Sequence, residues 1–218
     1  MTTTKSIALS AFLGFACLLH AGLASAQESQ RPPPNNVEYF QYGVALAVEQ
    51  LASGGSVCPK GALTPCILGS GGGLAIRMGY RSRGPWYFGG AYEFTRQDSS
   101  NLLRLAILQQ LRGEGRYYLD AGNRLTPYGS LVAGAVVYGN EWTASTVGPL
   151  AGAGLGLEFQ VTQSTVIGFA LNYRALVLHA WTDNTGQRRP ADHDLEFGLA
   201  HVIGFELTLE LRDPLARW

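Results

Sequence analysis

The chain has 218 residues, enough for one domain with a full core, so a second domain is not required. Hydrophobic residues make up 46% and charged residues only 15%, which is low for a soluble protein, where about a quarter is usual. The formal net charge is zero, so the charge balance gives no reason to expect a nucleic-acid partner. No apolar run of about 18 residues occurs beyond the first 26 residues, which argues against a membrane-spanning helix.

The first 26 residues have the pattern of a secretory signal peptide. Lys5 gives a positive start, residues 7–23 are apolar, and residues 24–26 read A-S-A, an A-x-A cleavage site. The alternative is an anchoring helix, which the short apolar run and the small-residue ending disfavour. The sequence therefore predicts an exported protein, whose mature chain begins with a stiff, Pro-rich lead-in over residues 27–36.

Cleavage would leave two cysteines, Cys58 and Cys66, in the segment C-P-K-G-A-L-T-P-C. Two nearby cysteines in an exported protein most often form a disulfide, so we expect this pair to close a small loop. A metal site is the alternative, but the segment has no histidine nearby and no second cysteine pair. No metal site is expected.

Eight segments of the mature sequence alternate between large apolar residues and small or charged ones. The last reads L-E-F-G-L-A-H-V-I-G-F-E-L-T-L-E-L-R, with glycines, alanines and carboxylates on one parity. A period of two is that of a β-strand, and most segments reach the roughly 9–11 residues that a tilted strand needs to cross a bilayer. The predicted strands cover residues 39–50, 71–82, 85–96, 102–120, 126–138, 150–161, 165–178 and 195–212.

The connections between these strands alternate in length. Short turns of two to five residues lie at 83–84, 121–125 and 162–164, and the other connections, at the cysteine loop, 97–101, 139–149 and 179–194, have five residues or more. Short periplasmic turns and longer external loops are typical of outer-membrane barrels. The sequence predicts an all-β fold, an eight-stranded antiparallel up-and-down transmembrane β-barrel over residues 37–213, with both termini periplasmic and a short tail over 214–218. The last strand should pair with the first and close the barrel.

The two faces of the strands must next be assigned to lipid or interior. A soluble, calycin-like ligand-binding barrel would turn its large apolar residues inward, and a membrane barrel reverses that. The polar parity is rich in glycine and alanine, which suits the crowded interior of a narrow eight-stranded barrel. The apolar parity carries many aromatic residues near strand ends, as an aromatic girdle would. We therefore expect the charged residues to lie inside.

On this assignment, arginines and glutamates face one another in the interior. Buried charges persist when they are paired, and an eight-stranded barrel is narrow, so a plug of salt bridges is preferred. A proton or ion path through a narrow pore is the alternative. The predicted interior charge network comprises Arg77, Arg81, Glu93, Arg104, Arg112, Glu114, Arg116, Glu158, Arg174, Glu206 and Glu210.

Two stretches, T-P-Y-G-S-L-V-A-G-A-V at 126–136 and G-A-G-L-G-L-E-F at 152–159, together with the signal peptide and the amphipathic strands, carry a family resemblance. The chain resembles the OmpA/OmpX-type outer-membrane β-barrel superfamily from about Val37 to Arg212. The resemblance implies insertion into the outer membrane of a Gram-negative bacterium by the barrel-assembly machinery, with a structural or adhesive function. The resemblance covers the barrel alone, so cell-wall anchoring through a peptidoglycan-binding domain is not expected. The proline at 214 departs from the terminal assembly pattern.

Some barrels of this size, resembling the PagL and PagP families, modify lipid A. Such a hydrolase needs a nucleophilic serine held by a histidine. The mature histidines are His179, His193 and His201, and none lies in the His-x-Ser arrangement of the PagL-like deacylases. His201 has the lipid-facing parity, and the other two flank the last loop. No catalytic residue and no cofactor are expected, so the sequence predicts a non-enzymatic protein, with a lipid A-modifying enzyme as an alternative.

The long loops carry aromatic and cationic residues where recognition often resides. Trp142, Trp181, Arg188 and Arg189 are the candidate recognition residues, and the two arginines could contact lipopolysaccharide phosphates. The expected partners are outer-membrane lipid, lipopolysaccharide and the barrel-assembly machinery, and the expected oligomeric state is a monomer.

Overall fold

A computed structural model describes residues 37–58, 65–119, 124–183, 186, 188–190 and 194–215. The predicted signal peptide and lead-in lie outside the described residues, as do His193 and most of the predicted C-terminal tail. The expected division of the chain into these segments stays a prediction.

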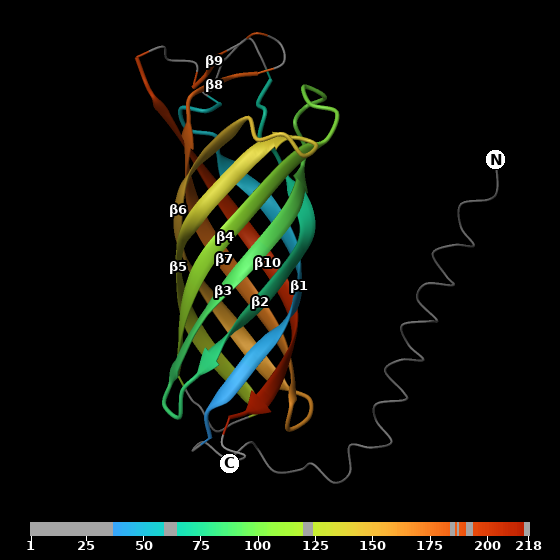
Figure 1. Ribbon diagram of the computed structural model, residues 1–218, viewed down its shortest axis with the longest axis vertical. Helices are drawn as coiled ribbons and strands as arrows, with labels where there is room; N and C mark the ends of the chain where they lie inside the picture. Colours follow the sequence, from blue (N-terminus) through green and yellow to red (C-terminus); the bar gives the residue numbers. More distant parts are fainter. Residues whose placement is uncertain are drawn as a thin grey trace, which may run out of the picture.

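Eight antiparallel strands form a closed barrel (Figure 1), in the order β1-β10-β7-β6-β5-β4-β3-β2. Strands β1 and β10 close it, with Tyr39 opposite Pro214 and Ser53 opposite His201. The all-β, eight-stranded fold is therefore confirmed. The barrel strands are β1 (Tyr39–Ser53), β2 (Gly71–Arg81), β3 (Trp86–Gln97), β4 (Ala106–Tyr118), β5 (Leu125–Asn140), β6 (Thr146–Gln160), β7 (Thr165–His179) and β10 (Phe197–Pro214).

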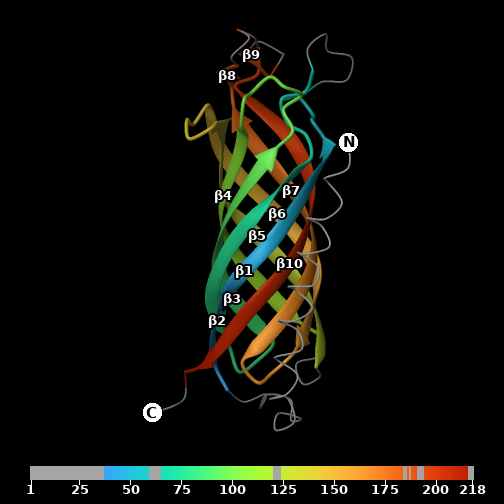
Figure 2. The same ribbon diagram turned by 90° about the vertical axis from the view of Figure 1, so that its right-hand side faces the viewer.

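The barrel has two different ends (Figure 2). At the end called here the turn end, tight connections join β2 to β3 and β6 to β7, and the outermost residues of β1 and β10 meet. At the loop end, the connection between β7 and β10 carries a small hairpin of β8 (Trp181–Thr182) and β9 (Arg188–Arg189). None of the residues that the structure describes forms a helix long and apolar enough to cross a membrane.

Several strand boundaries differ from the sequence prediction, and three of them change the connections at the loop end. Strand β5 extends to Asn140 and β6 begins at Thr146, so the connection expected over 139–149 shortens to 141–145. Strand β4 begins at Ala106 and not at 102. Residues 98–105 fold back on themselves, with Ser100 and Asn101 at positive φ, so the period-two pattern does not continue through them.

The strands have an apolar outer wall and a polar inner wall. Leu131 and Leu155 are each 71% exposed on the outside, whereas Glu93 and Gln110 are fully buried inside. A soluble protein buries its large apolar residues and exposes its charges, so this arrangement is reversed, as in a barrel surrounded by lipid.

Small inward-facing residues make room for a layer of buried tyrosine rings at the turn end, formed by Tyr87, Tyr118 and Tyr128. A Cβ at Gly156 would collide with the Tyr128 ring, which lies directly across from it on β5. Tyr128 packs in turn on Tyr118, with 5.3 Å between ring centroids. The glycine-rich inner parity therefore has a steric cause, since larger residues would not fit beside the tyrosines.

The interior at the loop end is apolar. Inward-facing residues of the strands meet Val57, Ile67 and Leu68, which flank the disulfide between Cys58 and Cys66. The predicted disulfide is thus present. The buried residues of this loop-end core are Val57, Ile67, Leu68, Leu103, Ala106, Leu108, Val136, Tyr138, Leu150, Leu176, Leu178, Trp181, Ala200 and Val202.

Candidate functional site

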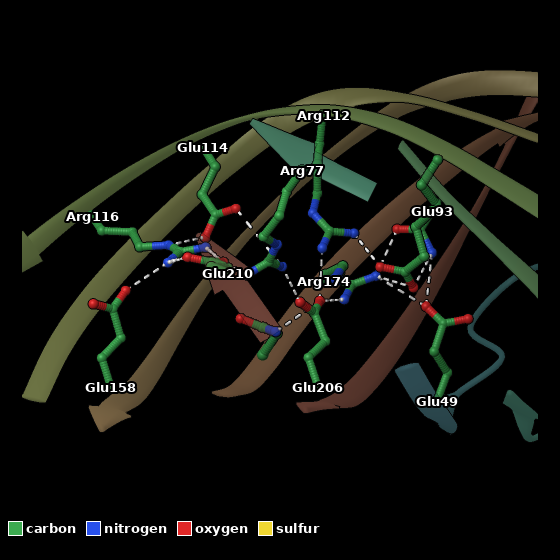
Figure 3. A network of polar contacts seen from close by, with 12 residues as sticks. Glu49, Arg77, Glu93, Arg112, Glu114, Arg116, Glu158, Arg174, Glu206 and Glu210 are labelled. Carbon is green, nitrogen blue, oxygen red and sulfur yellow. Dashed lines mark hydrogen bonds and ion pairs between the residues drawn. The ribbon is translucent and has the colours of Figure 1, made fainter. Parts of the chain in front are cut away.

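The barrel interior below the loop-end core is filled by ion pairs (Figure 3). Six arginines and six glutamates form this charge network, each at most 8% exposed, so their formal charges cancel. Strands β1, β2, β3, β4, β6, β7 and β10 contribute, because each places its polar parity inward. The members are Glu49, Arg77, Arg81, Glu93, Arg112, Glu114, Arg116, Glu158, Arg174, Glu206, Glu210 and Arg212.

Glu158 organises the part of the network nearest the turn end. Its carboxylate accepts hydrogen bonds from the guanidinium of Arg212 and from the hydroxyl of Tyr118. Arg116 Nη1 lies 2.9 Å from Glu158 Oε1, and Arg81 Nη1 lies 3.4 Å from Oε2. One carboxylate thus faces three guanidinium groups, which holds together strands β2, β4, β6 and β10.

Tyrosine rings cover the arginines at this end. The Arg81 guanidinium carbon lies 3.3 Å from the centroid of the Tyr118 ring. The Arg116 guanidinium lies 4.6 Å from the Tyr87 centroid and 5.0 Å from that of Tyr128. Such cation–π contacts stabilise a guanidinium that has left water, so the rings complement the carboxylates.

Glu206 is the centre of the network. Arg174 Nη2 lies 2.6 Å and Arg112 Nη2 2.7 Å from its Oε1, and Arg77 pairs with its Oε2. Asn172 Nδ2 donates a further hydrogen bond of 3.1 Å to Oε1. This carboxylate on β10 therefore links three arginines from β2, β4 and β7.

Glu210 and Glu114 join the centre to the turn end. Glu210 Oε1 lies 3.2 Å from Arg116 Nη2 and 3.3 Å from Arg77 Nη1. Glu114 Oε1 lies 2.7 Å from Arg116 Nε. Glu114 Oε2 and Arg77 Nε are buried without a hydrogen-bond partner, although Glu114 Oε2 is 3.9 Å from Arg77 Nη2. Coulomb attraction alone stabilises that oxygen.

Glu49 ends the network on the loop side. Arg174 Nη1 lies 3.0 Å from Glu49 Oε1 and 2.9 Å from Glu93 Oε1. Neutral donors complete the shell of Glu49, with Gln110 at 2.7 Å and Gln97 at 2.6 Å. The charged lumen thus passes through amide side chains into the apolar loop-end core.

Arg104 is the one predicted network residue that lies elsewhere. Its side chain is 88% exposed, and its Nη1 lies 3.5 Å from Glu141 at the loop end. The reason is the late start of β4, which leaves Arg104 in the folded-back connection. Glu49 and Arg212 were missed, although they share the inward parity of Ala47 and Glu210, and that parity was sufficient to find them.

Two of the four predicted recognition residues are buried. Trp181 is 7% exposed in the loop-end core, 6.4 Å from Tyr138 between ring centroids. Arg189 is 1% exposed, and its guanidinium bonds Asp183 Oδ2 at 3.1 Å and the Pro65 carbonyl at 3.2 Å. The prediction that both are available on an exposed loop was wrong, because the β8–β9 hairpin folds over the barrel mouth.

The other two predicted recognition residues remain accessible. Trp142 is 79% exposed and packs on Phe94, with 5.7 Å between centroids. Arg188 is partly exposed, and its Nη2 donates to the Leu195 carbonyl at 3.2 Å. Trp142 is therefore the most exposed aromatic side chain in the described connections between barrel strands.

The two histidines within the described ranges have local partners. His201 Nδ1 lies 2.6 Å from the Tyr173 hydroxyl on the outer wall, as its parity predicted. His179 is exposed, with Nδ1 3.0 Å from the Ala180 carbonyl oxygen. No group of three potential metal ligands occurs among residues with described positions.

No protein-family model matches the chain, and no curated protein matches it in sequence. Solved structures do match its fold. The outer-membrane protein AlkL, determined in lipid bilayers, aligns with a TM-score of 0.50 and 15% identity over 84% of this chain and 93% of its own. OprG from Pseudomonas aeruginosa (0.49, 13% identity, 85% and 98%) and Neisserial surface protein A (0.49, 16% identity, 80% and 95%) also align. The chain has the fold of the OmpA/OmpX-type eight-stranded outer-membrane β-barrels.

Proposed function

We propose that this protein is a non-enzymatic outer-membrane barrel with a structural or surface-interaction role, and that its interior does not conduct. The observation that carries the proposal is the pairing of an apolar outer wall with a lumen filled by twelve buried, mutually neutralising charges. Apolar side chains exposed all round a barrel are stable in lipid and unfavourable in water.

The filled lumen supports the absence of conduction. Arg112 of β4 pairs with Glu206 of β10, and Arg174 of β7 pairs with Glu93 of β3, and each of these ion pairs crosses the barrel. An ion that passed through would have to break such pairs, and stranding one buried charge costs about 3–5 kcal/mol. The apolar loop-end core adds a second barrier.

The contacts of the described histidines support a non-enzymatic assignment. A hydrolase needs a base within hydrogen-bond reach of a nucleophile. His201 instead contacts Tyr173 on the outer wall, and His179 contacts a backbone carbonyl.

On this proposal the loop end faces the exterior, and both ends of the barrel chain are periplasmic. The barrel is a monomer that the barrel-assembly machinery inserts, and its surroundings are lipid and lipopolysaccharide.

Fractionation tests the location. The chain is expressed with its first 26 residues, and outer membranes are separated from soluble periplasm. We expect recovery in the outer membrane and a mobility on denaturing gels that differs between unboiled and boiled samples. Recovery as a soluble periplasmic protein would contradict the proposal and favour a ligand-binding barrel.

Planar-bilayer recording tests the lumen. Purified wild type should give no stable conductance steps. The double variant Arg112→Ala and Arg174→Ala lacks two side chains that cross the lumen. It shows in the same recording how a barrel with a wider interior behaves. Stable steps from the wild type would show a narrow pore, and loss of lipid A acyl chains on overexpression would show an enzyme.

A further inference from the structure

A polar pocket of about 380 Å³ lies at the loop end, between the β1–β2 and β3–β4 connections. Its wall includes the side chains of two arginines from outside the charge network, Arg96 at the end of β3 and Arg104 in the β3–β4 connection. The hydroxyl and amide residues Ser70, Ser99 and Asn101 also line it. The pocket thus places two arginines around one polar concavity.

The pocket wall is held by bonds that do not use either guanidinium. Asp98 N donates to the Ser70 carbonyl at 2.7 Å, and Leu103 N donates to Ser99 Oγ at 3.1 Å. Leu103 is buried in the loop-end core, and Leu105 N donates to Asn140 Oδ1 at 3.1 Å. The connection therefore has a fixed shape independent of the arginine head groups, which leaves these groups available for a ligand.

Neither arginine is neutralised by a buried acid. Arg96 is exposed and makes no ion pair with any residue whose position is described. Arg104 has Glu141 at 3.5 Å, but the two side chains are 88% and 45% exposed, and such surface pairs contribute little. Asp98 also lines the pocket, so one acidic residue stands beside the two arginines, and its carboxylate accepts a 2.9 Å hydrogen bond from Ser100 N. The pocket consequently has two cationic groups with weak partners.

The height of the pocket on the outer wall indicates what surrounds it. Arg96 follows Phe94 on the same outward face, and Phe94 packs on Trp142. On the neighbouring strand, Gln109 accepts a 2.7 Å hydrogen bond from the Tyr92 hydroxyl, above the apolar Leu111. Going toward the loop end, the wall passes from aliphatic to aromatic to cationic, which is the order at a membrane–water interface.

We propose that Arg96 and Arg104 bind the phosphate of a membrane lipid head group in the leaflet at the loop end. Guanidinium groups match phosphate oxygens in geometry and charge, and cations at the membrane surface attract anionic lipid. The Asn101 amide in the wall is a further donor, whereas the Ser70 and Ser99 hydroxyls already donate to Gln50 Oε1 and to the Leu103 carbonyl. The inference rests on the proposed membrane location.

Spin-labelled lipids test it. The mature chain is refolded into phosphatidylcholine vesicles, and electron paramagnetic resonance compares the association of labelled phosphatidic acid with that of labelled phosphatidylcholine. We expect the wild type to prefer phosphatidic acid by a factor on the order of tenfold. The double variant Arg96→Gln and Arg104→Gln should lose most of that preference.

The control variant is Arg83→Gln, which removes an exposed arginine at the opposite end of the barrel, 3.2 Å from Glu38. It should keep the wild-type preference. Equal preferences in the wild type and the double variant would overturn the inference, and displacement of the lipid by millimolar inorganic phosphate would overturn its lipid source. A chain that gives no heat-modifiable form in any vesicle would instead contradict the proposed membrane location.

Discussion

Individual carboxylates of the network differ in how many guanidinium groups depend on them. Glu206 contacts three arginines and is 1% exposed, whereas Glu141 at the loop end contacts one exposed arginine. The cost of removing a buried charge comes mainly from the opposite charges that are left without a partner. The free energy of unfolding should therefore respond very differently at the two positions.

Glu206→Gln should lower the free energy of unfolding by about 3–5 kcal/mol, because the Arg77, Arg112 and Arg174 guanidiniums lose their shared anion. Urea titration of the refolded barrel in vesicles, followed by unboiled gel mobility, measures it. Glu141→Gln is the matched control and should cost less than about 1 kcal/mol. Equal effects would mean that the interior pairs are solvated.

Two glycines on the neighbouring strands β5 and β6 provide a second comparison of stability. A Cβ at Gly156 would meet the Tyr128 ring inside the barrel, whereas nothing lies within 4 Å of a Cβ at Gly129 on the outer wall. Gly156→Ala should destabilise the barrel by about 1–3 kcal/mol through overpacking. Gly129→Ala should be neutral or slightly stabilising in the same titration. A neutral Gly156→Ala would show that the tyrosine layer moves freely.

At the scale of elements, the cysteine loop is a plug for the barrel mouth. Val57, on the first side of this loop just before Cys58, packs against Gly198 of β10, and a Cβ at Gly198 would collide with the Val57 side chain. On its second side, the Tyr138 hydroxyl donates to the Ile67 carbonyl. The disulfide joins these two sides, so it ties the plug to β5 and β10 without taking part in barrel pairing.

Replacing both Cys58 and Cys66 by serine should therefore loosen the plug by about 2–3 kcal/mol and leave the barrel closed. The emission of Trp181, measured in a background with Trp86, Trp142 and Trp218 replaced by phenylalanine, should shift to the red. Unboiled gel mobility should stay that of a folded barrel. Loss of that mobility would show that the loop is needed for closure.

Alternation along the chain was sufficient to predict the strands, because a polar inner wall and an apolar outer wall impose a period of two. It was insufficient at the loop end, where both parities of a strand are apolar, as for Val177 and Leu178 of β7. There the inner wall packs on Trp181 and Leu103, which belong to connections. Contacts between connections distant in sequence carry no periodic signal, so the burial of Trp181 and Arg189 could not be predicted.

At the scale of the whole molecule, the apolar outer wall predicts that a charged side chain placed on it destabilises the barrel in lipid. Leu131, near the middle of β5, is 71% exposed on this wall. Leu131→Arg should cost about 2–4 kcal/mol in a bilayer, where an arginine side chain meets hydrocarbon. Ala144→Arg, in the exposed β5–β6 connection, should be neutral in the same vesicle titration. If Leu131→Arg were equally neutral, the wall would face water.

The distribution of charge among the strands has a consequence for assembly. Strands β2 to β7 together contribute five arginines but only three glutamates to the network, whereas β1 and β10 contribute Glu49, Glu206, Glu210 and Arg212. A sheet that lacks its two terminal strands is therefore a cationic surface, and the strands that complete it are net acidic. Attraction across the open edge should favour the native register, since a two-residue slip would set Glu206 and Glu210 against the wrong arginines. Charge neutralisation and ring closure thus become one event, whose rate should fall as ionic strength rises.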